Sequence, residues 1–426
     1  MPRFSDETLH ARRERLAAAL DAEGPAIVIG AGVPLSKPGG LDQCFPYRPH
    51  PEYYWLTGLT RPGGAVGYVP GEGWTSFVVP VSDAERLWTA DECSPVGTDI
   101  SKLAQWCEAH RGRGIVILGC PISEIAAISD PPGDMQFRID AVRRRKDSEE
   151  IAILRAAIDA TASGFAAAQH CIRPGVTERS IQIELEAAMF RSGAEGVGYE
   201  SIVGIGPHAA ILHCQPGNQI AGADDMVLID AGGEIGFYTA DVTRTYATSG
   251  KFTPEQQAIY DIVLAAELAS IDRCRLGVEW HDVHRTAAGE IAAGLKHLGI
   301  LTCGIDEALD TAAVWLFFPH GIGHTLGLGV RDVGGHAPNR NPGRKCCGAT
   351  PRIDLPLEPD FVVTVEPGIY FVPAILDDAK SYRQQFRDAV DWDKLQPWRA
   401  VGGVRIEDNV LITQGVPVVL TAGIPK

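Results

Sequence analysis

Four carboxylates and one imidazole recur along the last half of the chain, each beside a short run rich in β-branched residues. Each of these side chains is therefore expected at a strand end, facing a shared cleft. An oxygen-rich donor set of this kind suits Mn²⁺, Mg²⁺ or Co²⁺ better than the thiolate-rich sites that select Zn²⁺. Because four carboxylates exceed the charge of one divalent ion, the set predicts two ions. The candidate ligands are Asp230, Asp241, His324, Glu366 and Glu407.

Length and charge exclude several classes of protein. The chain has 426 residues and a formal net charge of −16. Its length predicts two or three domains. Its acidic excess disfavours nucleic acid and anionic membranes as partners. The apolar runs are too short to span a bilayer, and the charged N-terminus predicts an amphipathic helix rather than a signal peptide.

The ten cysteines show no CxxC pair and no regular spacing. Without an export signal they are interpreted as reduced, mostly buried thiols, which predicts a cytoplasmic location. Cys346 and Cys347 are adjacent in a loop rich in Lys and Gly, where they could be exposed. Metal binding by this pair is the less favoured interpretation.

The chain is predicted to be α/β (α+β), with a small N-terminal α/β domain at 1–140 and a second domain at 141–426. The charged run AVRRRKD marks the boundary and is interpreted as a solvated linker. Asp147 or Ser148 can cap the helix that follows. The apolar face of that helix is predicted to contain Ile151, Leu154, Ile158 and Phe165.

The four carboxylates have specific places on the predicted strands. Asp230 and Asp241 flank a glycine-containing turn, which would bring them together on neighbouring strands. The Pro-Gly pair after Glu366 predicts a type II turn. Glu407 is expected on the strand face opposite Arg405, and a glutamate in an apolar strand is costly to bury unless it is paired or metal-bound. Taken singly, each carboxylate also fits a turn or a solvated strand edge.

Two histidines, His320 and His324, lie four residues apart in HGIGHTLGLG. The segment contains no HExxH, so the helical zinc-protease motif is absent. Its glycines permit close backbone approach, as expected beside a bound substrate.

These segments, in this order over about residues 141–426, resemble the pita-bread metallopeptidases that cleave before proline. Within that branch they are most similar to Xaa-Pro dipeptidases (prolidases). The resemblance implies a pita-bread catalytic domain after a creatinase/prolidase-like N-terminal domain. It also implies two divalent ions, Mn²⁺ first and Co²⁺, Zn²⁺ or Mg²⁺ as alternatives. A hydroxide bridging them would hydrolyse the Xaa-Pro bond of a dipeptide.

The resemblance also assigns roles to single residues. Asp230 would bind one ion, Asp241 and Glu407 would bridge both, and His324 with Glu366 would complete the second site. Glu366 would pass the proton to the proline nitrogen. His213 would lie over the metal site, and His320 would lie behind the ligands or face the substrate. Either histidine would stabilise the oxyanion. Arg405, beside the last ligand, would orient a carboxylate bidentately and contribute to substrate binding.

Dipeptide specificity depends on two arginines. Arg352, in a long insertion typical of prolidases, matches the arginine that binds the free carboxylate of a dipeptide. Arg331 stands in VRD where the family usually has a histidine in VHD, and since arginine cannot accept a proton, it excludes proton transfer there. Either arginine is a candidate for substrate binding. Trp88 matches a tryptophan that a partner subunit places over the site, which implies a homodimer.

Two alternatives stay open. Aminopeptidase P shares the five ligands and takes longer peptides, and the stretch FPYRPHPEYYWLTGL somewhat resembles that enzyme. A non-catalytic pita-bread binding module is the other class. It is disfavoured because such scaffolds usually lose metal ligands, and this chain has all five.

Overall fold

The computed structural model describes residues 4–88, 95–122, 125, 127, 129–378 and 380–426. The chain divides into two compact units, Pro2–Val142 and Arg143–Lys426. Helix α5 (Met135–Arg144) crosses this division. The boundary predicted after residue 140 also falls within that helix.

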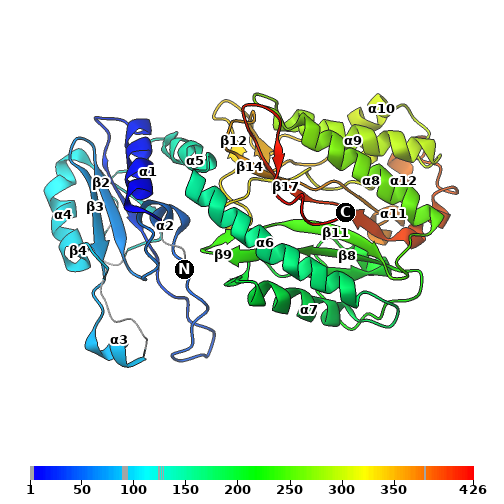
Figure 1. Cartoon of the computed structure of the whole chain (residues 1–426). Helices are drawn as coiled ribbons and strands as arrows, with labels where there is room; N and C mark the ends of the chain where they lie inside the picture. The colour runs from blue at the N-terminus through cyan, green and yellow to red at the C-terminus, as the bar shows by residue number, and fades with distance from the viewer. Residues whose placement is uncertain (1–3, 89–94, 123–124, 126, 128, 379) are drawn as a thin grey trace. The chain divides into compact units, whose positions relative to one another are not determined.

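The N-terminal unit is built on a five-stranded mixed sheet with the order β4-β3-β2-β1-β5 (Figure 1). Strand β1 pairs with β2 in antiparallel and with β5 in parallel orientation. One face packs on α4 through Leu103 and Cys107, which contact the cluster containing Val28 and Phe77. Its elements are α1 (Asp6–Ala19), β1 (Ala26–Gly30), α2 (Pro51–Thr57), β2 (Ala65–Val69), β3 (Gly73–Val78), α3 (Asp83–Trp88), β4 (Thr98–Asp99), η1 (Ile100–Lys102), α4 (Leu103–His110), η2 (Arg111–Arg113) and β5 (Ile115–Gly119).

The second unit contains short strands between two helix pairs, α6–α7 and α8–α9, which lie on opposite sides of the strands (Figure 1). Its helices are α6 (Ser148–Cys171), α7 (Glu178–Arg191), η3 (Gly206–Ala210), α8 (Pro254–Arg273), α9 (Trp280–His297), α10 (Ile305–Asp310), η4 (Ala313–Leu316), α11 (Pro373–Leu376), α12 (Tyr382–Gln385) and η5 (Gln396–Val401). Its strands are β6 (Gly196–Val197), β7 (Ile202–Ile205), β8 (Met226–Ala231), β9 (Gly233–Ile235), β10 (Tyr238–Thr239), β11 (Val242–Ala247), β12 (Gly335–His336), β13 (Ile353–Asp354), β14 (Val362–Val365), β15 (Gly368–Tyr370), β16 (Gly403–Arg405), β17 (Asp408–Leu411) and β18 (Val418–Val419).

Three small sheets carry the carboxylate segments. They have the orders β11-β8-β7, β14-β17-β18 and β15-β16. An isolated bridge from Thr243 to Glu407 links β11 to the segment between β16 and β17, and a bridge from Thr325 to Val363 links the segment of His324 to β14. Segments from 230 to 407 are thereby brought to one place.

Helix α6 begins at a reciprocal capping box. The Asp147 carboxylate accepts from the backbone N–H of Glu150, and the Glu150 carboxylate accepts from that of Asp147. By length and composition α6 could cross a membrane, but 50% of its most apolar window is buried inside the protein, as in a core helix. Of the predicted apolar face, Leu154, Ile158 and Phe165 are buried and Ile151 is half-buried.

The charged run before α6 is not a solvated linker, so that expectation was wrong. Arg143, Arg144 and Lys146 are all buried. Arg143 Nη2 and Lys146 Nζ lie 2.9 and 3.0 Å from the two carboxylate oxygens of Asp332. Asp332 also accepts from the N–H groups of Leu328 and Val333. These ion pairs bury the run and fix Asp332, the residue that follows Arg331 in its loop.

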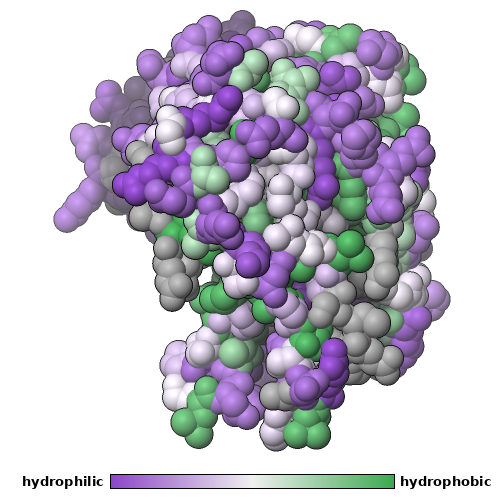
Figure 2. All heavy atoms as spheres, turned by 90° about the vertical axis from the view of Figure 1, so that its left-hand side faces the viewer, coloured by the Kyte–Doolittle hydropathy of each residue, from purple (hydrophilic) through white to green (hydrophobic). Residues whose placement is uncertain are grey.

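Exposed apolar side chains gather on two segments of the N-terminal unit, residues 33–45 and helix α3. Figure 2 shows hydrophobic side chains at the lower end of the face that it presents. Trp88 is 84% exposed, so it is not a core tryptophan. The exposed members of the two segments are Val33, Leu35, Leu41, Phe45, Leu87 and Trp88.

Candidate metal centre

Strands β8 and β11 bring Asp230 and Asp241 together, as their spacing predicts. Asp230 lies on β8 opposite Thr243, and Asp241 directly precedes β11. The hydroxyl of Tyr199 lies 2.6 Å from Asp230 Oδ1 and 2.5 Å from Asp241 Oδ1, so the two carboxylates share one donor. Tyr199 was not anticipated, because nothing in its own segment marks it as a partner of two distant aspartates.

His324 reaches the site because the glycine-rich segment lies against β14. The Thr364 N–H donates to the His324 carbonyl at 2.8 Å. A Cβ on Gly323 would lie 2.1 Å from the Thr364 carbonyl oxygen, so only glycine fits there. The predicted close approach is therefore to a strand.

The tautomer of His324 follows from its backbone contact. Nδ1 lies 3.0 Å from the Thr325 carbonyl, which can only accept, so Nδ1 carries the proton. Nε2 faces Asp241 Oδ2 at 3.3 Å and Glu366 Oε1 at 3.8 Å. Burial opposes protonation of the ring, but these two carboxylates prevail and raise the pKa of His324. Since Nδ1 is held by the backbone, Nε2 is the nitrogen that would bind a metal. A histidine ligand oriented through its other nitrogen is the usual arrangement in metal sites.

Glu407 and Arg405 point to the same side, so the expectation of opposite faces was wrong. Residues two apart on a strand share a face. Thr243 links them, because its hydroxyl donates to Glu407 Oε2 at 2.7 Å and accepts from Arg405 Nε at 3.1 Å. Arg405 Nη2 also donates to Asp230 Oδ2 at 2.6 Å, a single contact rather than a bidentate one.

The Pro-Gly pair after Glu366 does not form a type II turn. That turn requires a positive φ at its glycine, and Gly368 has none. It instead begins β15, and a Cβ there would lie 2.4 Å from the hydroxyl oxygen of Tyr370. The glycine lets this hydroxyl lie over the strand, where it contacts Arg405 Nη1 and His320 Nε2, each at 2.9 Å.

His320 is held by contacts on both ring nitrogens. Nδ1 lies 2.9 Å from the Gly321 carbonyl, and Nε2 faces Tyr370. Burial, together with the charge of Arg405, lowers the pKa of His320 to about 3. The ring is therefore neutral, and its one N–H is already used.

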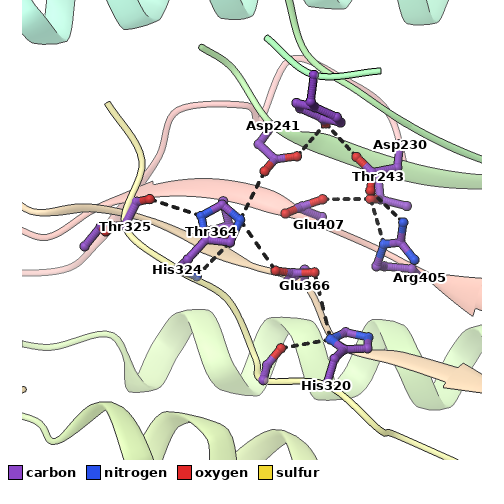
Figure 3. A network of polar contacts seen from close by, with 12 residues as sticks. Asp230, Asp241, Thr243, His320, His324, Thr325, Thr364, Glu366, Arg405 and Glu407 are labelled. Atoms are coloured by element: carbon purple, nitrogen blue, oxygen red, sulfur yellow. Dashed lines mark hydrogen bonds and ion pairs between the residues drawn. The ribbon is translucent and has the colours of Figure 1, made fainter. Parts of the chain in front are cut away.

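The four carboxylates outnumber the cationic groups beside them, which are Arg405 and His324. Burial and the neighbouring carboxylates together raise the pKa of Glu366 to about 7, although His324 and Arg405 act against them. The same two causes raise the pKa of Glu407 well above its ordinary value. Donor atoms of Asp241, His324 and Glu407 lie within 4.8 Å of one another. Figure 3 shows these side chains converging with Glu366. Buried oxygen donors with excess negative charge fit divalent cations.

The centre lies in a cavity of about 740 Å³. Ten of the eleven residues predicted for the site line it; Trp88 does not. His213, Arg331 and Arg352 are exposed on its wall. In the described part of the chain, none of these three side chains forms a hydrogen bond or an ion pair with another residue, so each can contact a substrate.

Comparison with known proteins identifies the family. The model of metallopeptidase family M24 matches residues 152–414. The chain belongs to metallopeptidase family M24. A probable Xaa-Pro aminopeptidase of Coccidioides posadasii is 31% identical over 98% of this chain and 94% of its own length.

Solved structures agree with this assignment. The chain is similar to Pseudomonas aeruginosa aminopeptidase PepP, with a TM-score of 0.82, 27% identity and coverage of 100% of this chain and 97% of that one. It is also similar to E. coli aminopeptidase P bound to the inhibitor Pro-Leu, with a TM-score of 0.81, 27% identity and the same coverage. The catalytic unit therefore has the pita-bread fold, as predicted.

Family membership also bears on the cofactor. M24 metallopeptidases use divalent metals, typically in pairs. The donor set of this chain fits such a pair, with Asp230, Asp241, His324, Glu366 and Glu407 as the residues that would hold it. The identity of the metal stays a prediction, with Mn²⁺ expected first because the donors are rich in oxygen.

Proposed function

We propose that this chain is a metal-dependent Xaa-Pro aminopeptidase, which releases the first residue of peptides that have proline second. The observation that carries this proposal is the joint presence of a cavity floored by four carboxylates and an imidazole and of similarity to aminopeptidase P over the full chain. The sequence alone favoured a dipeptidase and left aminopeptidase P as the alternative. The comparisons favour aminopeptidase P.

The long insertion that contains Arg352 loses its weight as a mark of dipeptidases. A relative named for Xaa-Pro aminopeptidase activity matches 98% of this chain, a span that includes this insertion. One specific observation still supports dipeptidase activity. Arg331 and Arg352 are exposed in the cavity, and each presents a guanidinium that could bind a free carboxylate.

Different residues of the cavity would serve different steps of the hydrolysis. When bound, two divalent ions would supply a nucleophilic hydroxide at neutral pH and polarise the scissile carbonyl. Glu366 is placed to pass a proton to the proline nitrogen, because it borders the cavity and faces both His324 and His320. His213 is the better donor to the oxyanion, since the N–H of His320 is already bonded.

The proposal extends to the assembly and location of the protein. The exposed Trp88 supports a homodimer in which this side chain covers the partner's cavity. The nine cysteines in the described residues are free thiols, which supports a reducing, cytoplasmic location. Light scattering of the purified protein measures its mass, and a monomer at micromolar concentration would contradict the homodimer.

Peptide length tests the specificity. With Mn²⁺ present, we expect turnover of Ala-Pro-Ala with a higher kcat/KM than Ala-Pro. Turnover confined to Ala-Pro would instead assign the chain as a dipeptidase. Turnover of neither peptide, together with no divalent metal in protein purified without chelator, would favour the non-catalytic binding module.

A further inference from the structure

A second cluster of metal donors lies apart from the carboxylates, where α9 contacts the loop with adjacent cysteines. His284, Cys346 and Cys347 each offer a donor atom, all within 4.8 Å of one another. Cys347 is buried and Cys346 is half-buried, so the pair is not exposed, although the sequence of its loop allowed exposure. The loop is folded back on itself and on α9, with Cys346 and Ala349 exchanging backbone hydrogen bonds and Cys346 Sγ 3.5 Å from the His281 carbonyl.

His284 points to a missing ligand. Its side chain is 1% exposed, and neither ring nitrogen has a hydrogen-bond partner. The backbone of Cys346 is beside the ring but does not form a hydrogen bond of acceptable geometry. Leaving a buried polar group without a partner is destabilising, so a bound ion is a physical reason for the presence of this histidine. Phe318 stacks on the ring at 5.2 Å and leaves the nitrogens unsatisfied.

The backbone brings both thiols to one side. Adjacent side chains on an extended chain point to opposite sides. Cys347 has a φ of 48°, a left-handed conformation that is uncommon for a residue with a side chain. The two Sγ atoms lie 3.9 Å apart. Two thiolates on tetrahedral Zn²⁺, with Zn–S bonds of about 2.3 Å, lie roughly 3.8 Å apart.

Charge also favours a divalent ion. Two thiolates and a neutral imidazole carry a charge of −2, which one Zn²⁺ cancels, so the buried unit would be neutral. The two thiol protons would pass to solvent on binding. Sulfur donors select softer ions than the carboxylate centre does.

We propose that His284, Cys346 and Cys347 form a zinc site, distinct from the carboxylate centre, with one coordination position left for water. Lys345 and Gly348, which flank the cysteines, line the active-site cavity. A bound ion would therefore fasten that wall of the cavity to α9. This site does not depend on the specificity proposed above.

Cobalt absorption tests the proposal with a readout other than activity. Thiolate-bound Co²⁺ gives a near-ultraviolet sulfur-to-metal charge-transfer band, which a centre of carboxylates and imidazole cannot give. Co²⁺ is added to the reduced full chain after the carboxylate centre has been loaded with Mn²⁺. The band should saturate at one thiolate-bound Co²⁺ per chain and disappear when Zn²⁺ displaces the cobalt. Absence of the band from the wild-type protein would overturn the proposal.

Variants locate the site. Cys346→Ser with Cys347→Ser should abolish the band while the carboxylate centre still retains Mn²⁺, which shows that the variant is folded. His284→Gln should weaken binding at least tenfold, since even outer partners of ligands contribute ten- to a hundredfold. Cys214→Ser is the matched control, because Cys214 belongs to another donor cluster with Glu178 and His208, and it should keep the band. A band that survives in the double variant, or an unchanged affinity in His284→Gln, would contradict the site.

Thiol counting separates zinc from oxidation. Zn²⁺ should protect two thiols of the native protein from a thiol reagent, and a chelator should restore their reactivity. If the two thiols instead return only on reduction, the pair forms a disulfide and the zinc site is wrong.

Discussion

The guanidinium of Arg405 donates to Asp230 Oδ2 at 2.6 Å, and neither side chain is free to turn away. Asp230 Oδ1 is held by Tyr199, while Arg405 is held by Tyr370 and Thr243. Because both oxygens of Asp230 are fixed by protein contacts, its remaining lone pairs are aimed before any metal binds. This pre-organisation is what outer contacts add to a metal ligand.

Replacing Arg405 tests that role. Arg405→Lys keeps the charge but cannot reach all three partners, so we expect Mn²⁺ affinity to fall about ten- to a hundredfold. Calorimetric titration of the metal-free protein measures the change. Arg399→Lys, at a partly exposed pair with Asp377, should leave the affinity unchanged. Equal affinity in wild type and Arg405→Lys would refute the pre-organisation.

Tyr199 should matter most when no metal is bound. Tyr199→Phe removes the hydroxyl shared by Asp230 and Asp241, and we expect the metal-free protein to lose about 1–3 kcal/mol of unfolding free energy. With Mn²⁺ bound, the cations compensate the carboxylates, so the loss should be smaller. Denaturant unfolding with and without Mn²⁺ gives both values, and an equal loss would contradict the shared contact as the cause.

Arg352 is expected to affect peptides according to their length. Burial and the nearby charge of Arg331 lower the pKa of Arg352, but its guanidinium remains charged at neutral pH. Arg352→Ala should lower kcat/KM for Ala-Pro about ten- to a hundredfold, since a charged hydrogen bond contributes about 1.5–3 kcal/mol. Longer peptides, which do not place a carboxylate there, should lose much less. If only Arg331→Ala lowers kcat/KM selectively for dipeptides, Arg331 binds the carboxylate instead. If Arg352→Ala lowers kcat/KM equally for peptides of all lengths, Arg352 does not bind the carboxylate of a dipeptide.

Asp332 should be a strong determinant of the stability of the folded protein. Asp332→Asn removes the carboxylate that faces the buried ammonium of Lys146, whose other hydrogen bonds go to backbone carbonyls, and this loss should cost about 3–5 kcal/mol. Denaturant unfolding at pH 7 measures it. The control Asp388→Asn removes an exposed pair with Arg387 and should change stability by less than about 1 kcal/mol.

The pH dependence of that loss follows from the sign of the shift. Burial opposes ionisation of Asp332, but Lys146 and Arg143 prevail, and the pKa is lowered in the folded protein. A lowered pKa contributes stability that is complete above the ordinary carboxyl value of about 4 and is lost as pH falls through the folded value. The difference between wild type and Asp332→Asn should therefore be constant above about pH 5 and shrink below about pH 4. A difference that grows on acidification would contradict the ion pair.

The convergence of the five candidate ligands and the two-unit architecture could be predicted from the sequence. Each carboxylate alone also fits a turn or a strand edge, so the prediction depended on the order of the five segments and their resemblance to a family. The capping box of Asp147 and Glu150 needs only neighbouring residues, and the structure shows it.

Contacts between distant segments could not be predicted in this way. The charged run at Arg143 looks solvated until Asp332, far along the chain, is placed beside it. Tyr199 lies 31 and 42 residues from the aspartates that it joins. The turn expected at Gly368 failed for a similar reason, because the glycine makes room for Tyr370 rather than for a positive φ.

Metal-dependent release of the first residue from Ala-Pro-Ala tests the central claim most directly. Protein stripped by a chelator should release no alanine, Mn²⁺ should restore release, and Glu407→Ala should retain neither metal nor activity. Ala-Ala-Ala, which differs only in the residue after the scissile bond, should not be cleaved. Release that persists without metal, or that proceeds equally on Ala-Ala-Ala, would contradict a metal-dependent peptidase specific for proline.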